Sequence, residues 1–317
     1  MATPMTPLEE MALRESAMRW LERRSNDGLE ALRYDEIEEF PGEFRGRPIA
    51  LKDRQRGIFK PAVFQEAALS VTTTFRAPGA ERPYDDAPGP DGLLRYKWRG
   101  EDPEQADNRA LRAAMAQGVP LIWFYGVAEG LYQPVFPVYL VAEEPEHQQF
   151  AVLVGEENQL HGSGVLGPVD FVHSPLQRRY AMQLAKRRLH QPVFRSQVLA
   201  AYQTRCAVCS FRHGELLDAA HIVPDSHERG IADVTNGLSL CKIHHSAFDI
   251  GFLGIRPDHV IEIRQDLLKE IDGPMLRHGL QELHHEKLRV LPGQRRSRPS
   301  SELLEIAYDR FRRRASA

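Results

Sequence analysis

The sequence predicts an α+β protein in which a β-rich N-terminal domain and a metal-binding C-terminal domain are joined by a basic helical linker. Short β-type runs broken by Gly and Pro fill residues 51–154. A strongly basic segment with a helical pattern follows over residues 171–202, and all 3 cysteines of the chain come after it. A length of 317 residues suffices for two domains of ordinary size.

These changes in sequence pattern divide the chain into four segments. We expect an N-terminal helical segment at residues 1–47, a β-rich domain at 48–168, the basic linker at 169–202 and the metal-binding domain at 203–317. A loose apolar stripe predicts a helix over residues 6–24. Pro299 and Ser300 predict the start of a final helix.

Composition narrows the function classes. Hydrophobic content of 42% and charged content of 27% are typical of a globular protein, and no run of about 18 apolar residues predicts a membrane span. Acidic residues near the N-terminus stand where a signal peptide is basic, so we expect a cytoplasmic protein in which thiols bind metal rather than form disulfides.

Positive charge is local rather than global. The net charge is −3, which argues against a generally basic DNA-binding protein, yet basic residues cluster in the linker. We expect these side chains to contact DNA phosphates: Arg178, Arg179, Lys186, Arg187, Arg188 and Arg195. A second basic cluster lies near the C-terminus, at residues 295–298 and 310–314.

The three cysteines form a zinc-binding pattern. Cys206 and Cys209 are a Cys-x2-Cys pair, and Cys241 with His244 forms Cys-x2-His. Each short spacing places two ligands on one edge of a tetrahedral ion. The pattern predicts a structural Zn²⁺ site, and polar residues between its halves are left over for chemistry.

The order His221, Asn236, His245 between and after these ligands resembles the HNH endonuclease family, whose catalytic unit is a ββα-metal fold. The resemblance implies a β-hairpin over residues 215–223 and 238–240, followed by a helix over 242–248. His221 would be the general base that activates water, as a neutral imidazole with an ordinary pKa of roughly 6.5. Asn236 would brace the loop or help fix the metal, and His245 would bind a catalytic divalent ion such as Mg²⁺ or Mn²⁺.

One position departs from the family pattern. Many members have His or Asp immediately before the catalytic His, as a second metal ligand, and this chain has Ala220 there. We expect Asp218 to be the replacement carboxylate, with Asp249, one helical turn past His245, as the alternative.

Residues 83–127 resemble an SRA domain, a module of the PUA-like barrels. The resemblance rests on four features: the run Tyr84–Asp85–Asp86, then Tyr96 with Gly100, the Asn108–Leu111 helix start, and Gly118–Pro120 before a strand. It implies a pocket for a modified cytosine flipped out of the duplex. Tyr84 and Tyr96 would sandwich the base, Asp86 or Asp85 would accept from its amine, and Asn108 would belong to the same pocket. The alternative is that both tyrosines are barrel-core aromatics and Asp85–Asp86 a turn.

Together these features predict a modification-dependent, type IV-like restriction endonuclease that acts on double-stranded DNA carrying 5-methyl- or 5-hydroxymethylcytosine. A double-strand break would require a homodimer or successive nicking. Two alternatives remain: a zinc-stabilised DNA-binding or regulatory protein whose HNH fold has lost activity, and a nuclease whose first domain senses another modification or damage.

Overall fold

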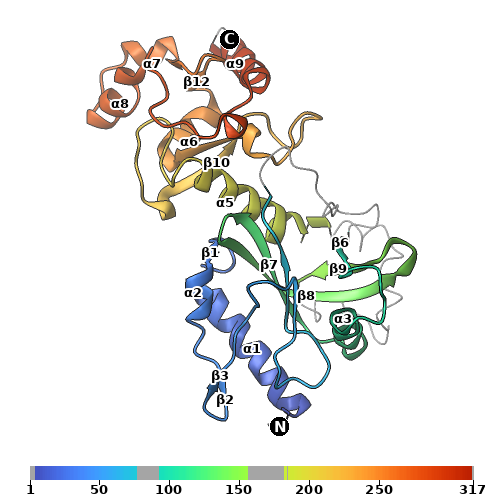
Figure 1. The fold of residues 1–317 in the computed structure, drawn as a ribbon. Coiled ribbons are helices and arrows are strands. Elements are labelled where there is room, and N and C mark those ends of the chain that lie inside the picture. Colours follow the sequence, from blue (N-terminus) through green and yellow to red (C-terminus); the bar gives the residue numbers. More distant parts are fainter. Residues whose placement is uncertain (1–3, 77–92, 156–181, 184, 316–317) are drawn as a thin grey trace, which may run out of the picture. The chain divides into compact units, whose positions relative to one another are not determined.

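The structure, a computed structural model, describes residues 4–76, 93–155, 182–183 and 185–315. The chain forms two units with separate hydrophobic cores, Met1–Val193 and Phe194–Ala317 (Figure 1). The first unit includes the expected N-terminal segment together with the β-rich domain, and the boundary between the units lies inside the expected linker. In the described part of the chain, no helix is long and apolar enough to cross a bilayer.

A seven-stranded sheet organises the first unit, with the strand order β4–β5–β7–β8–β9–β6 and β1 paired to β8. Its strands are β1 (Leu32–Arg33), β4 (Ile58–Phe59), β5 (Ser70–Thr73), β6 (Leu94–Lys97), β7 (Leu121–Ala128), β8 (Leu131–Glu144) and β9 (Gln149–Val154). The β5–β7 pair is parallel and the other pairs are antiparallel. A separate ribbon joins β2 (Glu43–Phe44) to β3 (Arg47–Pro48), and α2 (Tyr34–Glu38) follows β1.

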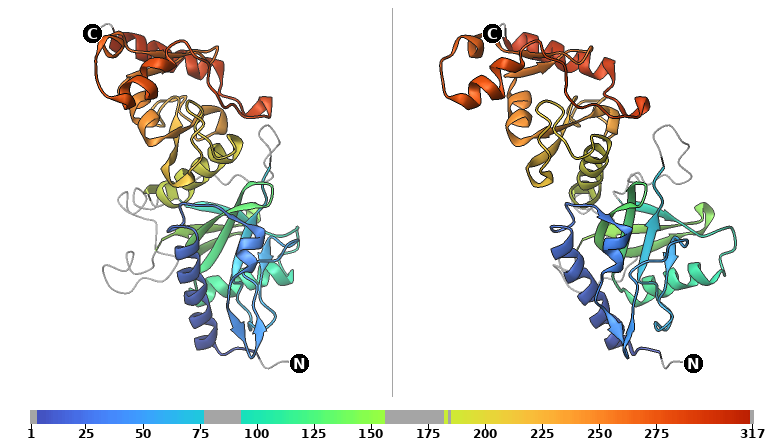
Figure 2. Two further views of the ribbon diagram at one scale, coloured as in Figure 1. Left: turned by 90° about the vertical axis from the view of Figure 1, so that its left-hand side faces the viewer. Right: turned by 60° about the vertical axis from the view of Figure 1, so that its left-hand side comes forward.

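The central strand β7 is buried on both faces, which explains its continuous apolar sequence. Ile122 and Phe124 pack in the core that includes α1 (Pro7–Arg24), whereas Leu121 and Trp123 pack in the core that includes α3 (Ala106–Gln117). The two helices therefore cover opposite faces of the sheet (Figures 1 and 2). Both helices agree with the sequence-based predictions, and α3 ends at Gly118 in the left-handed region.

The sheet curls until the two ends of its strand order approach each other. Tyr96, on β6 at one end, donates its hydroxyl at 2.9 Å to the carbonyl of Gly57, which immediately precedes β4 at the other end. The same hydroxyl is 3.3 Å from the Thr72 carbonyl on the neighbouring strand β5. The ring of Tyr96 also lies edge-on to Trp123, at 5.6 Å between centroids. The predicted β-rich domain is thus confirmed as a curled sheet, and its assignment to the SRA barrels stays a prediction.

The described residues 185–201 of the expected linker are helical. A π-helical turn, η4 (Lys186–His190), leads into α5 (Gln191–Ala201). Leu189 belongs to the core of the first unit, whereas Phe194 and Val198 belong to the core of the second.

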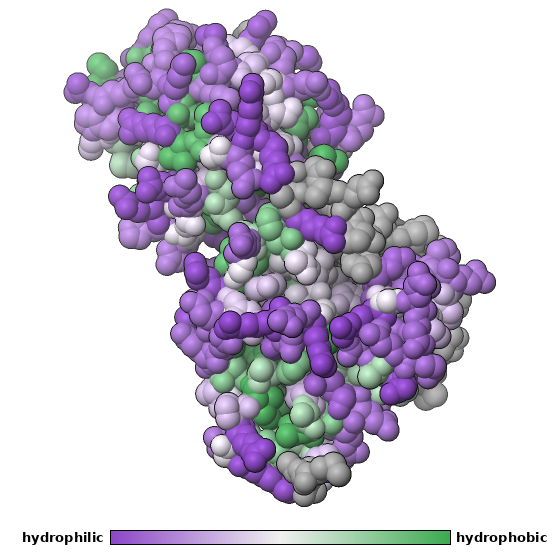
Figure 3. All heavy atoms as spheres, viewed as in Figure 1, coloured by the Kyte–Doolittle hydropathy of each residue, from purple (hydrophilic) through white to green (hydrophobic). Residues whose placement is uncertain are grey.

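The second unit begins with a hairpin of β10 (Leu217–His221) and β11 (Gly237–Cys241), followed directly by α6 (Lys242–Ile250). A second hairpin pairs β12 (Leu253–Ile255) with β13 (Ile261–Ile263). Three further helices are α7 (Gln265–Lys269), α8 (Pro274–Gly279) and α9 (Ser301–Ala315). Short helical turns complete the described elements: η1 (Pro145–His147), η5 (Gly214–Leu216), η6 (Val234–Asn236), η7 (Gln281–Leu283) and η8 (Arg295–Ser297). Hydrophilic residues cover most of the face in Figure 3.

Candidate active site and metal centre

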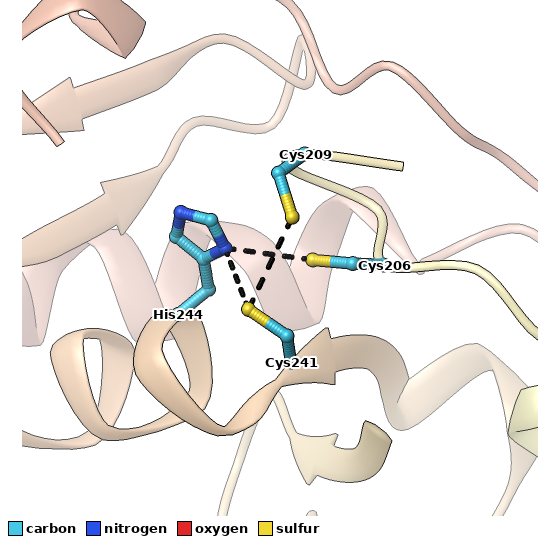
Figure 4. A group of neighbouring side chains, drawn as sticks. All are labelled: Cys206, Cys209, Cys241 and His244. Atoms are coloured by element: carbon cyan, nitrogen blue, oxygen red, sulfur yellow. Dashed lines mark hydrogen bonds between the residues drawn. The ribbon is translucent and has the colours of Figure 1, made fainter. Parts of the chain in front are cut away.

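Four side chains converge where β11 meets α6 (Figure 4). Cys206 and Cys209 come from the turn after α5, Cys241 ends β11, and His244 lies in the first turn of α6. The Cys209 and Cys241 sulfurs are 4.0 Å apart, and His244 Nδ1 is 3.6 Å and 3.1 Å from the sulfurs of Cys206 and Cys241. A tetrahedral ion with bonds of about 2.3 Å holds its ligands about 3.8 Å apart. The predicted cluster is therefore confirmed, and its size and donor set fit Zn²⁺.

The surroundings of the cluster also suit a cation. His244 is buried, and its Nε2 donates to the Gly279 carbonyl at 2.8 Å. This bond leaves Nδ1 to face the sulfurs, as the outer hydrogen bond of a metal-bound histidine does. The neighbouring thiol of Cys206, followed by that of Cys241, raises the pKa of Cys209. A divalent cation would reverse this effect by stabilising the thiolates.

His221 is the last residue of β10 and stacks on the ring of Phe194 from α5, with the ring centroids 4.1 Å apart and the planes 19° from parallel. Its cross-strand partner is Gly237. A Cβ on Gly237 would lie 2.3 Å from a methyl carbon of Val198, so only glycine allows α5 to approach the hairpin this closely. The approach of α5 places Phe194 against the imidazole and orients it.

Asn236 ties down the loop between the two strands of the hairpin. It is fully buried, and its Oδ1 accepts from the Val223 amide at 2.9 Å. Its Nδ2 donates to the carbonyls of Val223 and Ile231, both at 2.9 Å. All three bonds join Asn236 to the segment that follows His221, so its contacts are those of a brace.

His245 lies between two carboxylates. Its Nδ1 is 3.3 Å from Asp218 on β10, and its Nε2 is 3.3 Å from Asp249, one turn further along α6. Asp218 points to the same face of the strand as Ala220, because side chains two residues apart share a face. The structure therefore brings both predicted carboxylates to His245, one on each ring nitrogen.

Lys242 adds a charge that the sequence-based prediction missed. Its ammonium is 2.6 Å and 2.7 Å from the two carboxylate oxygens of Asp218. Hydrogen bonding to His245, together with Lys242, lowers the pKa of Asp218 to about 2. Asp218 in turn is the main cause that raises the pKa of His245. The available signal was spacing, since Lys242 and His245 are three residues apart on one helix face.

The predicted base-pocket residues are only partly described. Tyr84, Asp85 and Asp86 lie outside the described residues. Tyr96 is 8% exposed and packs inside the curled sheet. Asn108 is fully buried and holds the turn before α3, because its amide bonds to the backbone of Arg99 at 2.9 Å and 3.1 Å and to the Asp102 carbonyl at 2.8 Å. The contacts of Tyr96 and Asn108 are those of core residues, and their pocket role stays a prediction.

The predicted phosphate contacts also divide into groups. Arg178 and Arg179 lie outside the described residues, and Lys186 and Arg187 are exposed on η4.

Two of the arginines donate to the protein itself. Arg188 donates to the Phe136 carbonyl at 3.0 Å, and Arg195 donates to the carbonyls of Gly214 and Leu217 at 2.8 Å and 2.9 Å. Arg195 therefore fastens α5 to the start of β10, and a phosphate role for this cluster stays a prediction.

Comparison with known proteins identifies the class of the second unit. Residues 206–256 match the family model HNH_2, described as HNH endonuclease. The match spans the Cys₃His cluster, His221, Asn236, His245 and Asp249. The chain carries an HNH endonuclease domain, and the predicted enzyme class is confirmed.

Two solved structures are similar to longer stretches of the chain. One is the "Modification dependent TagI restriction endonuclease", with 18% identity, 81% of this chain and 86% of that chain covered, and a TM-score of 0.29. The other is "Structure of the Type IV phosphorothioation-dependent restriction endonuclease ScoMcrA", with 14% identity, 91% of this chain and 59% of that chain covered, and a TM-score of 0.25. The chain thus spans less than two thirds of the second protein. No curated protein matches the chain.

Proposed function

We propose that this chain is an endonuclease that recognises a modified cytosine in double-stranded DNA and hydrolyses the DNA backbone at its HNH site. The observation that carries the nuclease half of the proposal is the HNH match over residues 206–256, within which His245 is flanked by Asp218 and Asp249. The recognition half is supported by the resemblance of residues 83–127 to SRA domains.

In the proposed mechanism His221 takes a proton from water as the water oxygen attacks phosphorus. The bond from phosphorus to the leaving sugar oxygen breaks, and that oxygen takes a proton from solvent. The Phe194 ring holds the imidazole plane, and Asn236 keeps the segment after His221 in place through its three hydrogen bonds. A general base of this kind contributes on the order of 10²–10⁴-fold in rate.

His245 with Asp218 or Asp249 would hold a divalent ion such as Mg²⁺ or Mn²⁺. When bound, the ion would stabilise the charge on the phosphate and on the leaving oxygen. Lys242 holds Asp218 in its ionised form, which a hard cation requires of a ligand. The Cys₃His cluster would hold Zn²⁺ as a structural ion, because all four positions are filled by protein ligands.

The test uses matched supercoiled plasmids that are unmodified or carry 5-methyl- or 5-hydroxymethylcytosine. The wild-type chain with Mg²⁺ or Mn²⁺ should cut a modified plasmid faster than the unmodified one. His221→Ala should lose cleavage by about 10²–10⁴-fold while it keeps its zinc and its melting temperature. Open-circular product would indicate nicking, and linear product would indicate a double-strand cut.

The other outcomes separate the alternatives. Equal cutting of all plasmids would remove the modified-cytosine specificity and leave a general nuclease. Binding without cutting would indicate a zinc-stabilised DNA-binding protein. Near-normal cutting by His221→Ala would overturn the assigned general base.

A further inference from the structure

A groove of about 480 Å³ lies in the second unit between α9 and the segment that follows His221. Its lining combines an apolar floor with a basic rim. The floor is formed by Ile222, Val223, Pro224, Ile306 and Ala307, and the rim by His227, Arg310, Arg313 and Arg314.

One stripe of α9 supplies the basic rim. Arg310, Arg313 and Arg314 follow Ile306 at intervals of four, seven and eight residues, which places all four on one helix face. The adjoining stripe is fixed in the core, since Leu304 is fully buried and a Cβ at Gly254 would lie 2.5 Å from the ring of Phe311. The arginines are therefore presented from a rigid helix.

The groove lies beside residues that the HNH site uses. Its floor begins at Ile222, immediately after His221 in the chain. On the other side, Arg314 donates to the backbone carbonyl of Asp249 at 2.7 Å. The groove thus adjoins the end of the strand that carries His221 and the end of the helix that carries Asp249.

The rim carries more positive than negative charge. Burial and the neighbouring guanidinium of Arg314 lower the pKa of Arg310, while Asp249 opposes this effect. His227 and Arg313 are exposed on the same rim. Two guanidinium groups that repel each other over an apolar floor favour an anion with an apolar part, and the sugar–phosphate backbone of DNA has both.

We propose that this groove binds the sugar–phosphate backbone of the DNA strand that the HNH site cuts. Arg310 and Arg313 contact phosphates next to the scissile one, and the apolar floor packs against sugar. The groove thereby sets the position of the strand relative to His221. The proposal rests on the proposed nuclease function.

The experiment compares Arg310→Gln and Arg313→Gln with Arg312→Gln in the full-length chain. Arg312 is the matched control because it is exposed on the same helix, lies over the ring of Tyr308 and is absent from the groove lining. Binding to a short unmodified duplex is titrated at several salt concentrations without divalent ions. Each groove variant should bind about tenfold more weakly and lower the salt slope by about 1, whereas Arg312→Gln should match the wild type.

Cleavage of a plasmid that the wild type cuts gives the second readout. The groove variants should cut more slowly, and Arg313→Lys should recover part of the loss because it restores the charge. Unchanged zinc content and melting temperature show that the variants fold. If the wild type cuts DNA and both groove variants bind and cut like Arg312→Gln, the groove proposal is wrong. If the wild type cuts no DNA, the proposed function fails, and the groove proposal fails with it.

Discussion

At the scale of single residues, His245 has a carboxylate on each ring nitrogen, and the two carboxylates are not equivalent. The carboxylate of Asp218 also accepts a hydrogen bond from the Lys242 ammonium. At Asp249 it is the main-chain carbonyl that accepts one, from Arg314. Because its pKa is lowered, Asp218 contributes fully to stability above pH 3.8, and this contribution is lost as the pH falls toward 2. Because its pKa is raised, His245 contributes fully to stability below pH 6.5, and this contribution is lost as the pH rises through the raised pKa. The pair therefore stabilises the fold most between these two ordinary pKa values.

Asp218→Asn should lower the pKa of His245 toward its ordinary value of 6.5, because Asp218 is the largest cause of the increase. Asp249→Asn should lower it less. The measurement is an NMR titration of the His245 ring in the metal-free protein. Mn²⁺ affinity and cleavage rate, measured beside it, should fall most in the Asp218 variant. A larger loss of Mn²⁺ binding in Asp249→Asn would make Asp249 the ligand instead.

Residue spacing predicted part of this site. The Cys-x2-Cys and Cys-x2-His spacings located the Cys₃His cluster, and the position of Asp218 two residues before Ala220 located a carboxylate beside His245. Lys242 was missed although it shares a helix face with His245. Phe194 was missed because its stacking on His221 depends on how α5 packs against the hairpin. Local spacing along the chain does not report packing between elements.

At the scale of elements, the Cys₃His cluster joins the turn before the hairpin to the start of α6, so it fixes the helix that carries His245. Cys241→Ser should lower the zinc content below about one ion per chain and lower the melting temperature of the second unit, because metal binding and folding are coupled. Metal analysis and calorimetry measure both effects.

Ser210→Ala is a matched control for this variant, since Ser210 lies next to Cys209 and is not in the cluster. A Cys241→Ser chain with a full zinc content and an unchanged melting temperature would remove Cys241 from the metal site.

Elements with a strong local pattern were predictable, and their long-range pairing was not. The strands at residues 121–128 and 149–154 follow from apolar runs, and α3 follows from its helix start and Gly118. The pairing of Leu32–Arg33 with β8 joins segments about 100 residues apart. The parallel β5–β7 pair likewise depends on the curl of the whole sheet. Neither pairing can be predicted from the sequence of one strand.

At the scale of the whole molecule, the proposed recognition and the proposed chemistry belong to units with separate cores. Tyr84→Ala and Asp86→Ala should reduce the preference for modified DNA, with roughly 1–3 kcal/mol lost per stacked base. Weak salt-sensitive binding should remain, because phosphate contacts do not read the base. Binding titrations on paired modified and unmodified duplexes measure the preference.

Tyr96→Phe gives the informative comparison. It removes only the hydroxyl that joins the two ends of the curled sheet and keeps the ring, so it should lower stability. Tyr96→Ala removes the ring as well, and its preference for modified DNA should be unchanged if Tyr96 is a core residue. A preference lost in Tyr96→Ala and kept in Tyr96→Phe would place the ring in the pocket. Full discrimination by both Tyr84→Ala and Asp86→Ala would move the pocket elsewhere.

The brace at Asn236 has a consequence for the ageing of the protein. Asn236 is followed by Gly237, and asparagine residues that precede glycine are the most prone to spontaneous deamidation. Conversion to aspartate would replace an amide that donates to two carbonyls with a carboxylate that only accepts. In the folded protein the Asn236 side chain is held by three hydrogen bonds and the Gly237 amide donates to the Val234 carbonyl, so we expect slow deamidation. Deamidation while the chain is unfolded would leave the segment after His221 without the two hydrogen bonds that the Asn236 amide donates.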